Sequence, residues 1–255
     1  MTVKLISDEN TGIFNNLIPG EDLSSSVKLA VFDCDGTLVD SQHAINSCMS
    51  DAFRQVGLVP PPISRVRRVV GLPLAEAIQV LVSNDNGPDA HNTPPHIGDM
   101  VDAYSLSWQR LRKGGALDEP LFDGTAALLA SLKSIEWTLG VATGKSMRGL
   151  RQTLDHHELG GFFSTLQTAD VARGKPDPEM LHLAMLETQS EPVDTVMIGD
   201  TTYDMEMACA AGVRALGVAW GYHSPEDLMK AGAIRVFESW AELETYLKSM
   251  EDIAS

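Results

Sequence analysis

The sequence predicts an α/β protein: a Rossmann-like, doubly wound parallel sheet core with an inserted all-helical cap domain. From Lys28 onward, short β-branched runs alternate with helical patterns, as in proteins built from repeated strand–helix units. The clearest strands are continuous apolar runs, which is typical of parallel strands covered on both faces. Residues 41–119 interrupt this alternation with helical patterns and no convincing strand. We therefore expect one sheet with a helical insertion after its first strand.

The elements can be read in chain order. The expected strands are 28–33, 138–143, 195–200 and 214–220. The expected core helices are 124–134, 146–157, 177–189, 202–212 and 239–250, with a further capped helix start at Ser224. Gly212 has the position of a helix C-terminal glycine. In the insertion, helices are expected over 42–57, 64–83 and 98–113, with a polar, proline-rich loop at 84–96.

These elements predict the domain boundaries. Residues 27–40 and 120–255 form the α/β core, residues 41–119 form the cap, and residues 1–26 form a polar N-terminal extension. A chain of 255 residues that is 44% hydrophobic is long enough for such a core with a smaller inserted domain.

Composition excludes several functions. A formal net charge of −16 argues against binding nucleic acid, which requires a basic surface. Three scattered cysteines form neither a disulfide framework nor a zinc site and fit a reducing, cytoplasmic setting. There is no apolar run of about 18 residues, so no membrane span is expected, and the N-terminus has no secretory pattern.

Polar residues follow the ends of three predicted strands. They are Asp33-Cys34-Asp35-Gly36-Thr37, Thr143-Gly144-Lys145, and Gly199-Asp200 with Asp204 one turn beyond. Lys175 lies in a loop before a proline-primed helix. Because parallel strands bring their carboxyl ends to one edge, ligands of open α/β sheets bind there. One site is therefore expected to collect these side chains.

The charges of this site predict a metal and a phosphoryl ligand. Four carboxylates in one cleft repel one another, by about 4 kcal/mol for a pair about 4 Å apart. Mg²⁺ is the natural counter-ion, because it binds through one or two carboxylates together with substrate phosphate. The hydroxyl of Thr143, the N–H of Gly144 and the ammonium of Lys175 suit a phosphoryl oxyanion.

Four segments in order, "DCDGTLVDS", "VATGK", "RGKPDPE" and "IGDTTYD", resemble the motifs of the haloacid dehalogenase (HAD) superfamily. The resemblance runs from about Lys28 to Leu247, and "VVGLPLAEAI" is similar to a cap segment of the phosphoglycolate-phosphatase-like branch. It implies that Asp33 is the nucleophile and Asp35 the general acid and base.

The resemblance also implies the ligand sets. Mg²⁺ would be held by Asp33, the carbonyl of Asp35 and Asp200, with Asp204 supporting directly or through water. Thr143, Gly144 and Lys175 would bind the phosphoryl group.

Other residues of these motifs have ordinary interpretations. Cys34 is expected to be a small packing residue, and Lys145 and Arg148 surface charges at a helix start. The functional residues have alternative interpretations too: a helix cap for Thr143, a solvated loop lysine for Lys175 and a solvated helix acid for Asp204.

The acid at Asp35 favours phosphate-ester hydrolysis or phosphoryl transfer over dehalogenation. The expected function is Mg²⁺-dependent hydrolysis of a small phosphorylated metabolite, phosphoglycolate-like or a sugar phosphate, by a monomer or homodimer. A sugar phosphomutase of β-phosphoglucomutase type and a non-catalytic phosphate-binding protein remain alternatives. Candidate contacts to the leaving group in the cap are His43, Arg65, Arg67, Arg68 and Gly71. An arginine there would suit a second anionic group on the substrate.

Overall fold

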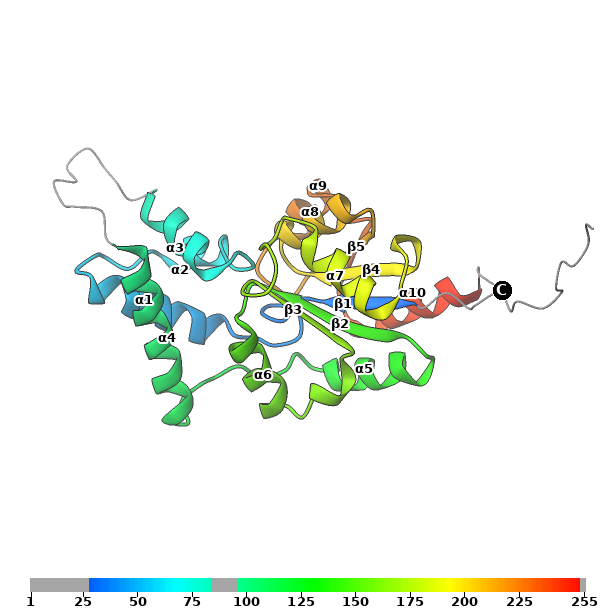
Figure 1. The fold of residues 1–255 in the computed structure, drawn as a ribbon, viewed down its shortest axis with the longest axis horizontal. Coiled ribbons are helices and arrows are strands. Elements are labelled where there is room, and N and C mark those ends of the chain that lie inside the picture. Colours follow the sequence, from blue (N-terminus) through cyan, green and yellow to red (C-terminus); the bar gives the residue numbers. More distant parts are fainter. Residues whose placement is uncertain (1–27, 84–95, 253–255) are drawn as a thin grey trace, which may run out of the picture.

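The computed structural model describes residues 28–83 and 96–252. Its strands are β1 (Leu29–Phe32), β2 (Thr138–Thr143), β3 (Thr165–Thr168), β4 (Thr195–Gly199), β5 (Arg214–Val218) and β6 (Arg235–Phe237). Within the described residues they form one parallel sheet in the order β3-β2-β1-β4-β5-β6 (Figure 1). This is the doubly wound order, in which the winding reverses beside the central strand β1. The predicted fold class is confirmed.

The four strands predicted from apolar runs are confirmed, and β3 and β6 are additional. Strand β3 has the sequence TLQT and contains the buried polar residues Thr165, Gln167 and Thr168, so it lacks the apolar signal. Strand β6 has three residues at the edge of the sheet, with Arg235 exposed. Both strands form because a neighbouring strand supplies hydrogen-bonding partners, which a local pattern does not report.

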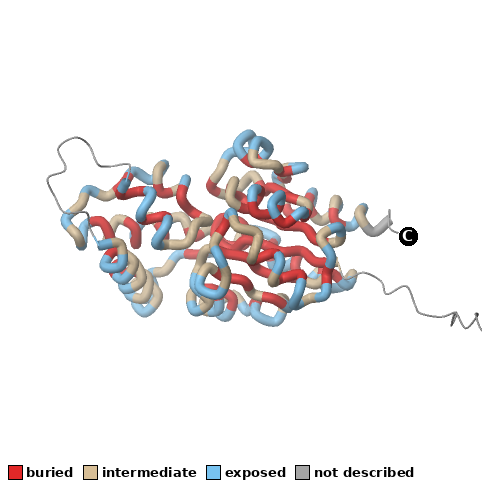
Figure 2. The backbone as a smooth tube through the Cα atoms, turned by 45° about the horizontal axis from the view of Figure 1, so that its top comes forward, coloured by how far each residue is buried: buried red, intermediate tan, exposed pale blue. Residues whose placement is uncertain are grey.

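Helices cover both faces of the sheet. On one side lie α5 (Thr125–Ser134), α6 (Met147–His156) and α10 (Trp240–Asp252), and on the other lie α7 (Glu179–Thr188), α8 (Thr202–Ala211) and α9 (Pro225–Lys230) (Figure 1). Strand β1 is buried throughout and contributes to both layers: Ala30 and Phe32 pack in one apolar cluster, Leu29 and Val31 in the other. This alternation is the two-residue period of a strand. Figure 2 shows the buried sheet between its exposed helix surfaces.

The insertion after β1 is helical in its described residues. It contains α1 (Gln42–Gln55), α2 (Ile63–Arg67), α3 (Leu74–Ser83) and α4 (Ile97–Lys113), set to one side of the sheet (Figure 1). These helices have their own apolar cluster, which includes Phe53, Ile78 and Met100. The expectation of one helix over 64–83 is wrong. Gly71 has φ +100° and Pro73 lies two residues further on. The chain therefore turns after α2 ends, and a separate helix, α3, begins at Leu74.

The two connections between cap and core lie side by side. Val39 forms an antiparallel bridge with Leu121, and the Asp40 N–H donates to the Pro120 carbonyl at 2.8 Å. The Phe122 N–H donates to the Leu38 carbonyl at 3.1 Å. The chain therefore leaves the core and returns to it through a short two-stranded ribbon.

Two sequence predictions fall wholly or mostly outside the described residues: the extension at 1–26 and the loop at 84–96, of which only His96 is described. Among the described helices, none combines the length and the apolar character that crossing a membrane requires.

Candidate active site

Three acidic side chains meet beside the reversal point of the sheet. Asp33 follows β1, Asp200 follows β4, and Asp204 lies in the first turn of α8. Strands β1 and β4 are neighbours in the sheet, and Phe32 pairs with Ile198. The residues that follow the two strands, Asp33 and Asp200, therefore lie close together. One oxygen from each carboxylate lies within 4.8 Å of the other two, and all three residues are buried. Asp33 Oδ2 has no hydrogen-bond partner.

Burial and mutual repulsion perturb these acids. Burial raises the pKa of Asp33 to about 7; the charge of Lys175 opposes the rise, and the charges of Asp204 and Asp35 add to it. Burial, followed by the charges of Asp33 and Asp204, also raises the pKa of Asp200 well above its usual range. A buried carboxylate oxygen without a donor, close to two other carboxylates, fits a hard divalent cation such as Mg²⁺.

Asp200 is held rigidly by its neighbours. Its Oδ1 accepts a hydrogen bond from the Thr37 hydroxyl at 2.8 Å, and its Oδ2 accepts one from the Tyr222 N–H at 2.8 Å. Gly36 adopts φ +86°, and a β carbon there would collide with the Asp200 carboxylate. The glycine of the first motif is therefore required twice, for its backbone conformation and for this close approach.

Lys175 joins the acids from the loop before α7. It is fully buried, and its Nζ lies 3.0 Å from Asp33 Oδ1 and 2.5 Å from Asp204 Oδ1. Burial alone would lower its pKa, but the charges of Asp204 and Asp33 outweigh burial and raise it. Asp204 Oδ2 also accepts hydrogen bonds from the Thr201 N–H at 3.0 Å and its hydroxyl at 2.7 Å, so both oxygens of Asp204 have protein donors. The alternatives of a solvated lysine and a solvated acid are excluded.

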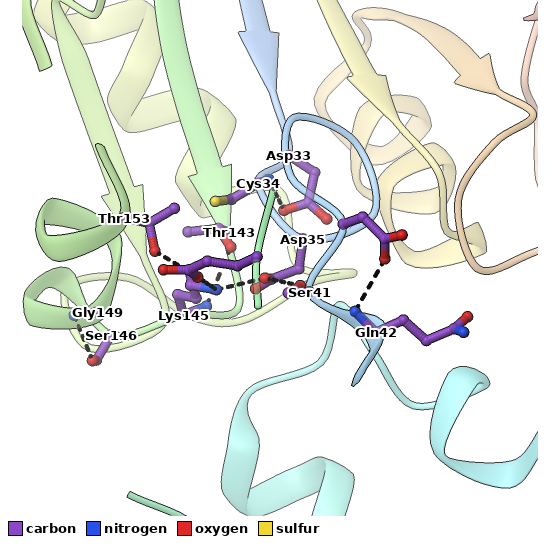
Figure 3. A network of polar contacts seen from close by, with 12 residues as sticks. Asp33, Cys34, Asp35, Ser41, Gln42, Thr143, Lys145, Ser146, Gly149 and Thr153 are labelled. Atoms are coloured by element: carbon purple, nitrogen blue, oxygen red, sulfur yellow. Dashed lines mark hydrogen bonds and ion pairs between the residues drawn. The ribbon is translucent and has the colours of Figure 1, made fainter. Parts of the chain in front are cut away.

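Asp35 has a separate set of partners, shown in Figure 3. Its Oδ1 accepts a hydrogen bond from the Ser41 hydroxyl and lies 2.5 Å from Lys145 Nζ. Lys145 Nζ also lies 4.0 Å from Glu119 Oε2 and 4.8 Å from the centre of the Trp108 ring. The charges of Asp35 and other acidic neighbours raise the pKa of Lys145, although burial opposes them.

The interpretation of Lys145 as a surface charge is therefore wrong. Its side chain is only 11% exposed, because α4 of the cap covers it and Asp35 binds it. Arg148, in contrast, is exposed. The signal that could have found Lys145 is its position two residues after the end of β2, within reach of the loop that follows β1.

Cys34 belongs to the apolar core, as expected. It is buried in the same cluster as Phe32, and burial raises the pKa of its thiol well above the usual value. Its side chain points away from the carboxylate of Asp33 in Figure 3. The backbone N–H of Cys34 donates to Asp33 Oδ1 at 2.6 Å.

Thr143 is the last residue of β2 and is buried. The helix that follows is capped by Ser146, whose hydroxyl accepts from the Gly149 N–H at 3.2 Å, so Thr143 is not its cap. A β carbon on Gly144 would lie 2.7 Å from the Leu72 carbonyl oxygen. The cap loop around residues 71–73 therefore packs directly on this end of the sheet.

The cap residues expected to touch the substrate have different environments. Arg65 Nη2 donates to the Leu81 carbonyl at 2.8 Å, and Arg67 Nη2 donates to the Gly221 carbonyl at 2.8 Å. His43 and Arg68 are exposed. Within the described chain, only Gly71 of this set lines the cavity beside Asp33 and Asp35, which has a volume of about 510 Å³. The structure thus places these two acids and Thr143, Gly144 and Lys145 in the lining of one cavity between core and cap.

A doubly wound sheet that presents a cluster of buried acids with room for a cation, a buried lysine and a covering helical cap indicates a capped α/β hydrolase suited to phosphoryl groups. The model of the family described as haloacid dehalogenase-like hydrolase matches residues 30–218. The chain belongs to this family.

Individual relatives agree with the family assignment. The chain is 32% identical over 219 residues to the "Probable phosphatase IndB" of Dickeya dadantii, covering 84% of this chain and 91% of that protein. It is 28% identical to the "Phosphoglycolate phosphatase 1" of Pseudomonas aeruginosa, covering 85% and 78%. A putative haloacid dehalogenase-like hydrolase from Bacteroides fragilis superposes with a TM-score of 0.75 at 26% identity, covering 85% and 99%. The predicted resemblance to the phosphoglycolate-phosphatase-like branch is confirmed, and the protein is a hydrolase of phosphoric monoesters.

Proposed function

We propose that this protein is a Mg²⁺-dependent phosphatase that hydrolyses small phosphomonoesters through an aspartyl-phosphate on Asp33. The observation that carries the proposal is the unpartnered, buried Asp33 Oδ2 beside Asp200, Asp204 and Lys175. A pure binding site would gain nothing from a buried carboxylate that repels phosphate. A nucleophile requires one, provided that a lysine and a cation neutralise it.

The cation would be held by Asp33 and Asp200, with the Asp35 carbonyl and Asp204 completing its surroundings. When bound, Mg²⁺ neutralises carboxylate and phosphate charge and so stabilises the transition state. Asp204 has a second task in this proposal, since its Oδ1 holds Lys175 Nζ at 2.5 Å. Lys175 in turn lies 3.0 Å from Asp33 and reaches the phosphoryl oxygens together with the Thr143 hydroxyl and the Gly144 N–H.

The reaction divides into two displacements. An Asp33 oxygen attacks phosphorus, the bond from phosphorus to the ester oxygen breaks, and Asp35 gives its proton to the leaving alcohol. Asp35 then takes a proton from water, whose oxygen attacks phosphorus and frees Asp33 and inorganic phosphate. Lys145 and Ser41 both bind Oδ1 of Asp35, so they orient the carboxyl group and leave Oδ2 for proton transfer. Lys145 is a positioning residue in this scheme.

The test is phosphate release from a panel of phosphomonoesters, with Mg²⁺ and with chelator, for the wild type and for Asp33→Asn. We expect activity that requires both the metal and Asp33, and a trapped phosphoryl group on Asp33 after rapid acid quench. Asp102→Asn, at an exposed position on α4, is the matched control and should retain activity. Absence of Asp33-dependent release from every ester would refute the proposal. Conversion of glucose 1-phosphate to glucose 6-phosphate without net phosphate release would identify a mutase instead.

A further inference from the structure

The cavity lined by Asp33 and Asp35 has two chemically different sets of lining residues. Its volume is about 510 Å³, and the lining includes the reaction centre in the core and side chains of the cap. Sites that enclose drug-sized organic ligands typically have volumes of about 300–1,000 Å³. A two-carbon alcohol such as glycolate would leave most of this space to water.

The cap side of the cavity is lined mainly by hydrocarbon and aromatic side chains. They come from three different helices and the loop before α3, and include Met49, Val69, Val70, Leu74, Tyr104 and Trp108. Tyr104 and Trp108 stack with ring centroids 6.0 Å apart and planes inclined by 20°. Water against such a surface is unfavourable, and burying a ligand's apolar surface there is favourable in proportion to the area removed from water.

The cations near this wall are already paired or peripheral. Lys145 is bound to Asp35, and the exposed Arg148 is the other cation among the cavity residues of the described chain. Arg65 and Arg67 donate to backbone carbonyls instead of entering the cavity. A second carboxylate or phosphate placed against the apolar side chains would therefore lose hydration without gaining a partner, and the polar side chains of the lining, Ser105, Gln109, Arg148 and Gln152, lie outside that wall.

We infer that the substrates are phosphomonoesters of bulky apolar alcohols, with an alkyl chain of about six or more carbons or one or two rings. The inference rests on the proposed phosphatase function and names its substrate class. The phosphate lies at Asp33, and the hydrocarbon part of the alcohol lies against the wall formed by Met49, Leu74 and Trp108. The Gly71–Pro73 loop closes the cavity from the cap side.

The test is a homologous series of ethyl, butyl and hexyl phosphates, since these primary alcohols are similar as leaving groups and differ only in hydrocarbon length. Each methylene that becomes fully buried should raise kcat/KM about fourfold, so the four methylenes from ethyl to hexyl phosphate give about 250-fold. Phosphoglycolate and glucose 6-phosphate serve as polar comparators and should be poorer substrates than hexyl phosphate.

Variants connect the preference to the wall. Leu74→Asn places an amide in the cavity and should reduce the hexyl-to-ethyl ratio of kcat/KM by about tenfold. Leu106→Asn changes a 57% exposed leucine on the same cap domain and should leave the ratio unchanged. If Leu74→Asn does not fold, Val101→Thr, a change of similar shape in the same cavity, should lower the ratio a few-fold.

The possible failures are distinguishable. A flat or falling kcat/KM along the alkyl series, with Asp33-dependent hydrolysis of phosphoglycolate or glucose 6-phosphate, would overturn the inference and leave the phosphatase function standing. No Asp33-dependent hydrolysis of any ester would overturn both.

Discussion

Without a bound metal ion, the folded protein should become less stable as pH rises, because of the carboxyl group of Asp33. In the unfolded chain this group loses its proton near its ordinary pKa of 3.8, whereas in the folded, metal-free site its pKa is about 7. Between these values the folded state binds the proton more strongly than the unfolded state. The stabilisation is therefore present at low pH and is lost as pH rises through the window from about 4 to 7.

The size of this effect follows from the two pKa values. Linkage gives a loss of about 2–3 kcal/mol in the free energy of unfolding between about pH 5 and pH 8 from this group alone. Asp200, whose pKa is also raised, adds to the loss with the same sign. Mg²⁺ in excess should restore stability at pH 8, because it binds the folded site and favours the ionised carboxylates.

Urea unfolding followed by tryptophan fluorescence, in chelator at both pH values, measures the effect. Asp33→Asn keeps the shape of the side chain but removes the titrating group, so the difference between its slope and that of the wild type isolates Asp33. Asp102→Asn, at an exposed position on α4, is the matched control and should behave as the wild type. Equal pH slopes for the wild type and Asp33→Asn would refute the reasoning.

Three further substitutions test the site. Lys175→Met should lower kcat about 10²–10³-fold, the range for losing one preorganised transition-state donor; an effect confined to KM would contradict its role. Gly144→Ala should lower kcat/KM, because the new β carbon would lie 2.7 Å from the Leu72 carbonyl oxygen and displace the cap loop from this end of the sheet; unchanged kinetics would contradict a role of that contact. Lys145→Gln should lower kcat while KM changes little, because the ion pair that orients the Asp35 carboxyl group is lost; a change in KM alone would show that Lys145 binds substrate instead.

The sequence predicted the core well because its signals are local. Each confirmed strand is a continuous apolar run, and Gly212 ends α8 in the left-handed conformation with φ +71°, as predicted. Strand β3 was not predicted because Thr165, Gln167 and Thr168 are polar although they are buried, and one of them has its partner far along the chain. The Thr165 hydroxyl donates to Glu187, 22 residues away.

The site was predictable in part for the same reason. The residues at strand ends share an edge by topology alone, so Asp33, Asp200 and Thr143 could be brought together without a structure. The burial of Lys145 could not be predicted in this way. It depends on Trp108 and Glu119, two residues of the insertion whose position against the sheet follows from the packing of the cap on the core. The basic residues of α2 suggested an anion site in the cap. In the structure, Arg65 and Arg67 instead donate hydrogen bonds to backbone carbonyl groups.

The paired connection between cap and core has a consequence for how such proteins diversify. Because Val39 bridges Leu121 and the Asp40 N–H bonds the Pro120 carbonyl, the insertion begins and ends at almost the same point in space. A foreign helical module grafted between these two points would need no change in strand order or in the placement of Asp33 and Lys175. The helices between these two points could therefore be exchanged as a unit, provided that Ser41 and Glu119 at the two ends are kept, because they contact Asp35 and Lys145.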